Sequence, residues 1–208
     1  ALRVVRGLLL QPDGRQSMSS ITTVDGPELA ERAARELEEA TAREIITWAA
    51  KTFGDGLCMT SSMADALMVD LASRQVPGID VIFLDTGYHF PETIGTRDAV
   101  ASTYDITLVN VEPRRTVAEQ DAALGPRLYG RDPNICCHLR KVEPLQRALE
   151  PYTAWLTGLR REDSITRRDT PVVQWDARKQ KTKVNPIARW TGEDVESYMA
   201  ENGVLVNP

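Results

Sequence analysis

Short apolar runs alternate with helical patterns through the first half of the chain, and this alternation restricts the fold more than any other feature. Residues 57–60, 80–85 and 106–111 are predicted to be buried strands. Helices are predicted between them, one capped by Ser61 and Ser62 and one beginning at Pro91. The order favours right-handed crossovers and a parallel sheet. We therefore predict a three-layer α/β protein with a mostly parallel, twisted sheet and helices on both faces.

The other segments fit the same plan. Helical spacing begins at Pro27, behind a candidate cap at Asp25, and breaks near Thr41. Later elements are predicted to be a helix over 116–124, a helix through the cysteines to about 150, a strand over 154–159, a hairpin of 172–173 with 183–184, and a helix from 192. We expect a single domain over 18–208. Residues 1–17 are interpreted as an extension, because their apolar core is too short for a secretory signal.

Polar residues follow two of the predicted strands, where ligands bind in parallel sheets. Ser61, Ser62 and Asp65 follow the first strand, and their hydroxyls with the helix N-terminus suit a phosphate-like anion, although a simple serine cap fits equally well. The second strand ends in a carboxylate, a hydroxyl and a glycine, for which a plain turn is the alternative. The candidate residues there are Leu84, Asp85, Thr86 and Gly87. We expect His89 to be a packed or surface imidazole.

Basic residues concentrate in the last third of the chain. The net charge is −5, which argues against nucleic-acid binding, yet residues 158–190 hold nine Lys and Arg against four acids. A loop after the strand at 154–159 carries four candidate anion-binding arginines, whose guanidinium groups match phosphate and sulfate oxygens. They are Arg160, Arg161, Arg167 and Arg168. Ordinary solvated loop cations are the alternative.

The chain has three cysteines, and two of them, Cys136 and Cys137, are adjacent. So few cysteines favour a reducing, cytoplasmic setting. On an α-helix Cys136 faces Arg140 and Cys137 faces Lys141, and such cations stabilise the thiolates that soft metals and iron–sulfur clusters require. Two packed thiols or a vicinal disulfide are the alternatives. Cys58, within an apolar strand, is expected to be structural.

Five motifs in register resemble the assimilatory adenylylsulfate (APS) reductases, the iron–sulfur branch of the APS/PAPS reductase family. The resemblance spans about residues 42–208, and the motifs lie at 60–67, 83–93, 134–145, 157–164 and 183–187. It implies an adenine nucleotide alpha-hydrolase-like fold. It also implies that adenosine 5′-phosphosulfate binds to the segments 61–65, 84–87 and 160–168.

The resemblance implies a cofactor as well. Cys136 and Cys137 would be two of the four ligands of a 4Fe-4S cluster, and Lys141 the cation between cluster and substrate. The related PAPS reductases lack these cysteines, so the pair favours APS. Family members continue with a Cys-x-x-Cys and a C-terminal nucleophilic cysteine, but these 208 residues hold no cysteine after Cys137. We expect this form to bind substrate without releasing sulfite.

The implied activity is thioredoxin-dependent reduction of APS to sulfite and AMP, in sulfate assimilation and cysteine biosynthesis, through an S-sulfocysteine on the C-terminal cysteine. We expect a cytoplasmic homo-oligomer with no nucleic-acid or membrane partner. The alternatives are a PAPS reductase, an ATP-pyrophosphatase relative, and a non-catalytic nucleotide- or metal-binding module if the protein ends at Pro208. A zinc ion shared between molecules is the alternative to the cluster.

Overall fold

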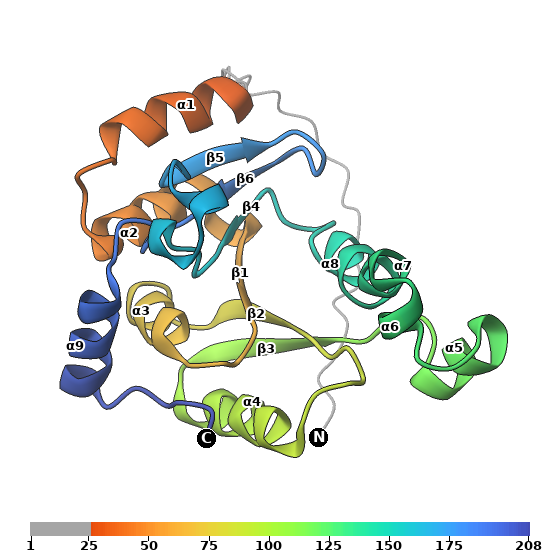
Figure 1. The fold of residues 1–208 in the computed structure, drawn as a ribbon. Helices are drawn as coiled ribbons and strands as arrows, with labels where there is room; N and C mark the ends of the chain where they lie inside the picture. Colours follow the sequence, from red (N-terminus) through yellow and green to blue (C-terminus); the bar gives the residue numbers. More distant parts are fainter. Residues whose placement is uncertain (1–25) are drawn as a thin grey trace, which may run out of the picture.

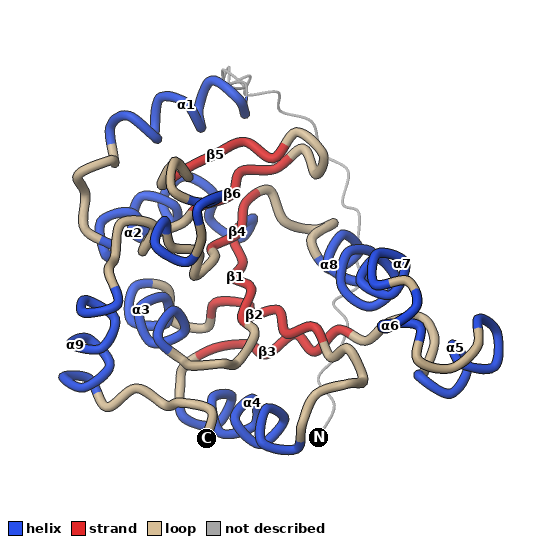
Figure 2. The backbone as a smooth tube through the Cα atoms, in the orientation of Figure 1, coloured by secondary structure: helices blue, strands red, loops and turns tan. Residues whose placement is uncertain are grey.

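A six-stranded sheet organises the protein, as a computed structural model of residues 26–208 shows (Figures 1 and 2). Its strand order is β3-β2-β1-β4-β6-β5. All neighbours are parallel except β5 and β6, so the predicted mostly parallel sheet is confirmed. The strands are β1 (Leu57–Ser61), β2 (Ile79–Leu84), β3 (Ile106–Val111), β4 (Ala154–Leu156), β5 (Val173–Asp176) and β6 (Lys181–Val184). The predictions for 1–17 and for the Asp25 cap lie outside the described residues.

Helices surround the sheet (Figure 1). They are α1 (Gly26–Glu36), α2 (Ala42–Phe53), α3 (Leu67–Gln75), α4 (Pro91–Thr103), α5 (Val117–Leu124), α6 (Leu128–Arg131), α7 (Pro133–Cys137), α8 (Glu143–Ala148) and α9 (Gly192–Asn202), with a π-helical turn at His138–Val142 and 3₁₀ turns at Gly54–Gly56, Arg161–Asp163 and Ile165–Arg167. Within residues 26–208, none of these helices has the length and apolar content needed to cross a membrane.

Alternating side chains bury both faces of the sheet. On one face Met59 and Phe83 belong to a large apolar cluster with residues of α1 to α4. On the other face Cys58 and Ile82 pack in a smaller cluster with Leu149, just after α8. The period of two along each strand sends neighbouring residues to opposite faces. The prediction of helices on both faces is therefore confirmed.

The structure corrects the start of α3. The chain does not enter a helix after Ser62, because Met63 adopts a left-handed backbone with φ of 59° and Ala66 occupies the N-cap position. The carboxylate of Asp65 accepts a hydrogen bond from the Leu67 N–H at 2.9 Å and so takes the role expected of the serines. The serine-cap interpretation was wrong. We call residues 61–66 the serine loop, and this segment contains no helix.

The cysteine helix and the strand after it also differ from the sequence prediction. The helix that carries the cysteines is divided into α7, the π-helical turn and α8. Pro144 lacks a backbone N–H and its ring crowds the preceding turn, which favours the wider π geometry there. Strand β4 ends at Leu156 rather than at 159. The residue after it, Thr157, donates a hydrogen bond from its hydroxyl to the Asn185 side-chain oxygen at 2.6 Å. The break near Thr41 is confirmed, since Thr41 caps α2.

Candidate functional site

Three hollows follow one another along the carboxyl edge of the sheet. The first, of about 450 Å³, lies between the serine loop and the arginine loop at 160–168, and we call it the anion hollow. The middle hollow, of about 270 Å³, shares the strand end at 60–62 with it. The cysteine hollow, of about 660 Å³, shares Lys141 with the middle hollow. The three hollows thus adjoin one another in a row, from the arginines past Lys141 to the cysteines.

The N-terminus of α3 opens onto the anion hollow, and the Asp65 carboxylate occupies only its Leu67 N–H. Ala66 at the N-cap position makes no side-chain hydrogen bond to the helix. The N–H groups of Ala64 and Asp65 also have no hydrogen-bond partner within residues 26–208. Leu67 and Met68 of the first helical turn line the hollow. Free N–H groups at a helix start carry partial positive charge, so the backbone here attracts an anion.

Cationic side chains complete the anion hollow. Arg160, Arg167 and Lys183 line it, and one acid, Asp163, pairs with both arginines at 3.0 and 3.1 Å. The buried Nη1 of Arg160 has no hydrogen-bond partner in the described part of the chain. Burial lowers the pKa of Lys183, and the neighbouring Lys179 and Arg167 lower it further. The three cations lie against two carboxylates, Asp65 and Asp163, so the hollow keeps an excess of one positive charge.

The structure brings only two of the four predicted arginines to the hollow. Arg161 donates to both carboxylate oxygens of Glu38, at 2.7 and 2.9 Å, and to the Thr170 carbonyl at 2.8 Å. This contact lowers the pKa of Glu38. Arg168 is exposed and does not line the hollow. Arg161 therefore fastens the loop to the segment after α1, whereas Arg160 and Arg167 face the anion hollow.

The loop after β2 folds on its own polar groups. The Asp85 carboxylate accepts from the Gly87 N–H at 3.0 Å, and Gly87 has a left-handed φ of 75°. The Thr86 hydroxyl accepts from the Tyr88 N–H at 3.3 Å. Leu84 and Thr86 line the middle hollow, but Asp85 and Gly87 do not. The plain-turn interpretation thus accounts for Asp85, whose carboxylate also lies 3.7 Å from Arg97.

His89 is a packed imidazole, as predicted. Its Nε2 lies 2.9 Å from the Leu84 carbonyl oxygen, and its ring is 4.9 Å from that of Phe83. Both neighbours line the middle hollow with it. The imidazole therefore shapes the wall of the middle hollow.

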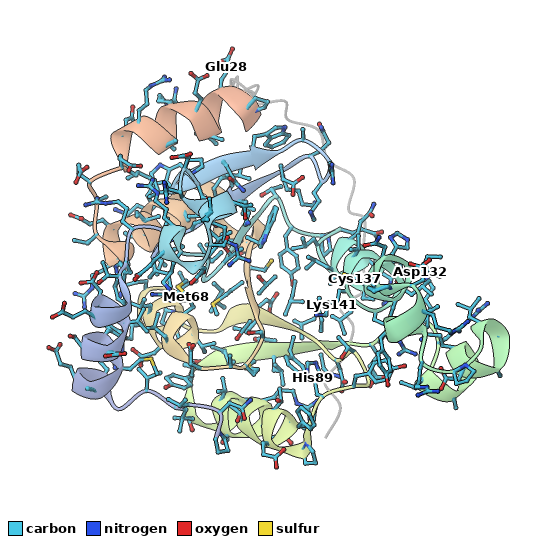
Figure 3. The ribbon with its side chains drawn as sticks, viewed as in Figure 1. Glu28, Met68, His89, Asp132, Cys137 and Lys141 are labelled. Atoms are coloured by element: carbon cyan, nitrogen blue, oxygen red, sulfur yellow. The ribbon has the colours of Figure 1, made fainter. Side chains whose placement is uncertain are left out.

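The two cysteines occupy different environments at the end of the row of hollows. Cys136 and Arg140 are buried, whereas Cys137 and Lys141 are exposed, and all four line the cysteine hollow. Figure 3 shows Cys137 and Lys141 near each other, on α7 and the π-helical turn that follows it. The Arg140 guanidinium donates to the Gln120 side chain at 2.9 Å and to the Thr86 carbonyl at 3.1 Å. No carboxylate within residues 26–208 pairs with it. A buried guanidinium without a carboxylate partner among those residues therefore shares the cysteine hollow with the two thiols.

The described residues offer two adjacent thiols, half the number of ligands that a four-coordinate metal centre needs. Residues 26–208 contain no group of three or more His, Cys, Asp or Glu side chains that could hold a metal. Cys136 and Cys137 offer two thiols of the type that iron–sulfur clusters and zinc use, and either centre takes four ligands. Cys58 is not a third, because it is buried in β1, where burial raises the pKa of its thiol to about 12.

A parallel sheet has a helix N-terminus and a cluster of cationic side chains at its carboxyl edge, and a pair of thiols lies further along that edge. This arrangement is typical of an α/β protein with a site for an anionic ligand. The family model "Phosphoadenosine phosphosulfate reductase domain" matches residues 56–208. The chain belongs to this reductase family.

Several curated relatives with more than half of their aligned residues identical to this chain carry the same enzyme name. The adenosine 5′-phosphosulfate reductase of Streptomyces coelicolor is 61% identical over 187 residues, which cover 90% of this chain and 79% of the relative. The enzyme of the same name from Mycolicibacterium smegmatis is 54% identical, covering 87% and 77%. That of Mycobacterium tuberculosis is 51% identical, covering 87% and 78%.

Solved structures agree on the fold. The phosphoadenylyl-sulfate reductase of Candida auris, solved as a phosphate complex, superposes with a TM-score of 0.76 at 30% identity and covers 93% of this chain and 92% of its own. The FMN adenylyltransferase of Candida glabrata has a TM-score of 0.54 at 11% identity, covering 82% and 55%, and so shows the fold alone. The predicted adenine nucleotide-binding type of α/β fold is confirmed.

Proposed function

We propose that the intact protein reduces adenosine 5′-phosphosulfate to sulfite and AMP, with thioredoxin as reductant. The observation that carries this proposal is the row of adjoining hollows from the anion hollow past Lys141 to the cysteine pair. Relatives at 51–61% identity, which bear the name of this activity, support it. The related Candida auris enzyme was solved with phosphate, which also supports an anion site in this fold.

The phosphosulfate group is proposed to bind at the strand end 60–62, because this wall belongs to both the anion and the middle hollow. From there it reaches Arg160, Arg167 and Lys183 on one side and Lys141 on the other. Backbone N–H groups of the serine loop would add donors. Of the predicted ligands, Ser61, Ser62, Asp65, Leu84 and Thr86 line these hollows.

The chemical step requires a thiolate that the 208 residues do not supply. In the proposed reaction a C-terminal cysteine thiolate attacks the sulfur of the substrate, the bond from sulfur to the bridging oxygen breaks, and AMP leaves with that electron pair. A thioredoxin thiolate then attacks the cysteine sulfur of the S-sulfocysteine and expels sulfite, and the second thioredoxin thiol resolves the mixed disulfide. Lys141 would offset the charge that develops on the phosphosulfate.

Cys136 and Cys137 are proposed to hold a 4Fe-4S cluster as two of its four ligands, with the other two from outside these 208 residues. The buried Arg140 and the exposed Lys141 fit this proposal, because a cluster bound by four thiolates is anionic. The cluster would supply structure and electrostatics at that end of the row of hollows. The cytoplasmic setting and the homo-oligomer remain predictions.

Product analysis tests the proposed activity against the alternatives. The intact protein incubated with the sulfonucleotide and reduced thioredoxin is expected to release sulfite and AMP in equal amounts. An ATP-pyrophosphatase relative would instead release pyrophosphate from ATP. Binding of nucleotide without any product would favour the non-catalytic module.

Lys183→Met is expected to weaken binding of AMP by roughly 10- to 100-fold, since a charged hydrogen bond to the phosphate is lost. The pKa of Lys183 is lowered in the free protein, chiefly by burial, and a bound anion favours the ammonium form. Affinity is therefore present below the lowered pKa and falls as pH rises through it. Calorimetry over the alkaline range checks this. An equally steep decline in the variant would assign the pH dependence to another group.

Neighbouring arginines provide a matched pair of variants. Arg160→Met is expected to weaken AMP binding by about tenfold or more and to leave the melting temperature nearly unchanged. Arg161→Met should leave the dissociation constant unchanged and lower the free energy of unfolding by about 1 kcal/mol, because it removes the partly exposed pair with Glu38. Calorimetry and thermal unfolding of both variants measure the contrast. Equal losses of AMP affinity would show that the structure does not separate their roles.

A further inference from the structure

The serine loop has an unusual backbone that is not stabilised by a helix. Met63 is fully buried with φ of 59°, a conformation that residues other than glycine rarely adopt. Within the loop, the Met63 N–H donates to the Ser61 hydroxyl and that hydroxyl donates to the Met63 sulfur. At its end, the Leu67 N–H donates to the Asp65 carboxylate. Such a conformation persists only where the surrounding structure holds it.

The segment after α9 pairs with the serine loop and holds its backbone in place. Val206 forms an antiparallel bridge with Asp65. The Ala66 N–H donates to the Leu205 carbonyl at 2.8 Å, and the Asn207 N–H donates to the Ala64 carbonyl at 3.1 Å. We call residues 205–207 the brace.

The brace is itself anchored to α4. The Leu205 N–H donates to the Tyr104 hydroxyl at 3.4 Å, and the Asn207 side-chain amide donates to the Thr93 hydroxyl at 3.0 Å. Thr93 lies in the first turn of α4, and Tyr104 directly follows its last residue. Figure 1 shows the end of the chain beside this helix. The serine loop is thereby tied to a helix that is distant from it in sequence.

The hydrogen bond to Ala64 has a direct geometric consequence. All peptide bonds of the described residues are trans, so the Ala64 carbonyl and the Asp65 N–H, which share one peptide plane, point in opposite directions. When Asn207 holds the carbonyl on the side of the brace, the Asp65 N–H must point away from it. This N–H has no partner within residues 26–208, and Asp65 lines the anion hollow.

We propose that the brace, through Asn207, is a positioning element that aims the Asp65 N–H at the phosphate of the bound nucleotide. This rests on the proposed nucleotide site. Asn207 touches no substrate in this account. It acts through the peptide plane between Ala64 and Asp65, so its loss should affect binding of the phosphate more than binding of the nucleoside.

The test compares two prolines in the intact protein. Asn207→Pro removes the N–H that holds Ala64, whereas Val206→Pro is the matched control, because the Val206 N–H has no partner within residues 26–208 and its side chain is 53% exposed. Calorimetry with AMP and with adenosine measures the role of the phosphate. We expect Asn207→Pro to raise the AMP dissociation constant by about tenfold and to leave that of adenosine close to the parent value. Val206→Pro should leave both near the parent values.

Three outcomes would contradict the proposed role of the brace. They are an unchanged AMP dissociation constant in Asn207→Pro, an equal loss of affinity for AMP and adenosine in that variant, or the same loss of AMP affinity in Val206→Pro. Should Asn207→Pro fail to fold, Asn207→Ala replaces it, since it removes only the anchor to Thr93. A smaller but selective loss of AMP affinity in Asn207→Ala would then support the proposed role of the brace. An unchanged AMP affinity would contradict it. A parent protein that does not bind AMP would instead contradict the proposed nucleotide site.

Discussion

Lys141→Met is expected to lower kcat/KM for APS reduction by the intact protein by about 10²- to 10³-fold, the usual effect of losing one preorganised group that stabilises transition-state charge. Lys141 lines both the middle and the cysteine hollow and is the lysine that joins them. In the proposed reaction its ammonium would face the charge that grows as the sulfur–oxygen bond breaks. The loss should therefore fall mainly on kcat, with KM changed less.

Two further variants isolate the charge of Lys141. Lys141→Arg keeps the positive charge and should recover part of the lost rate, although its planar group differs in shape. Lys51→Met is the matched control, because Lys51 is an exposed lysine of α2 that lines none of the three hollows. Steady-state rates of sulfite release with saturating thioredoxin measure all three. A Lys141→Met enzyme with the parent kcat would contradict the electrostatic role.

The double variant Cys136→Ser/Cys137→Ser is expected to lose its iron and inorganic sulfide together with the visible absorption of a cluster, and to reduce APS only at background rate. Serine hydroxyls do not provide the soft thiolate ligands that iron–sulfur clusters require. Iron and sulfide per chain, measured on protein purified without oxygen, check this independently of activity. Parental iron content in the double variant would refute the ligand assignment, and zinc without sulfide in the parent would favour a zinc site.

Cys58→Ala provides the control for the cysteine pair. Cys58 is fully buried in β1, on the face of the sheet that packs against α8. Its loss leaves a small cavity and is expected to lower the free energy of unfolding by about 1 kcal/mol. Iron content and the rate of sulfite release should stay at the parent level. Thermal unfolding and iron analysis of this variant separate a packing effect from a ligand effect.

The sequence predicted the sheet well because its strands are continuous apolar runs bounded by clear turns. The predicted strand 106–111 agrees with β3, and that at 57–60 differs from β1 by one residue. The start of α3 was missed because Ala64 to Ala66, which follow the left-handed Met63, pair with the brace, more than 130 residues away in the chain. Helix propensity depends on the local sequence and does not report such a long-range contact.

The candidate site was predicted at the level of loops better than at the level of side chains. Arg160 and Arg161 are indistinguishable in sequence, yet Arg161 pairs with Glu38, 123 residues away, and only Arg160 faces the anion hollow. Lys183 was missed as an anion-binding residue, although it opens the fifth motif at 183–187. Its place beside β4 in the sheet, which brings it to the hollow, is a tertiary property.

Sulfite release from APS and from PAPS, measured with the same intact protein and reduced thioredoxin at equal, limiting substrate concentrations, tests the central claim most directly. The proposed function predicts thioredoxin-dependent sulfite release from APS and a much smaller kcat/KM for PAPS. Equal or faster release from PAPS would contradict the assignment of APS as the substrate, and no sulfite from either would contradict the proposed reduction itself.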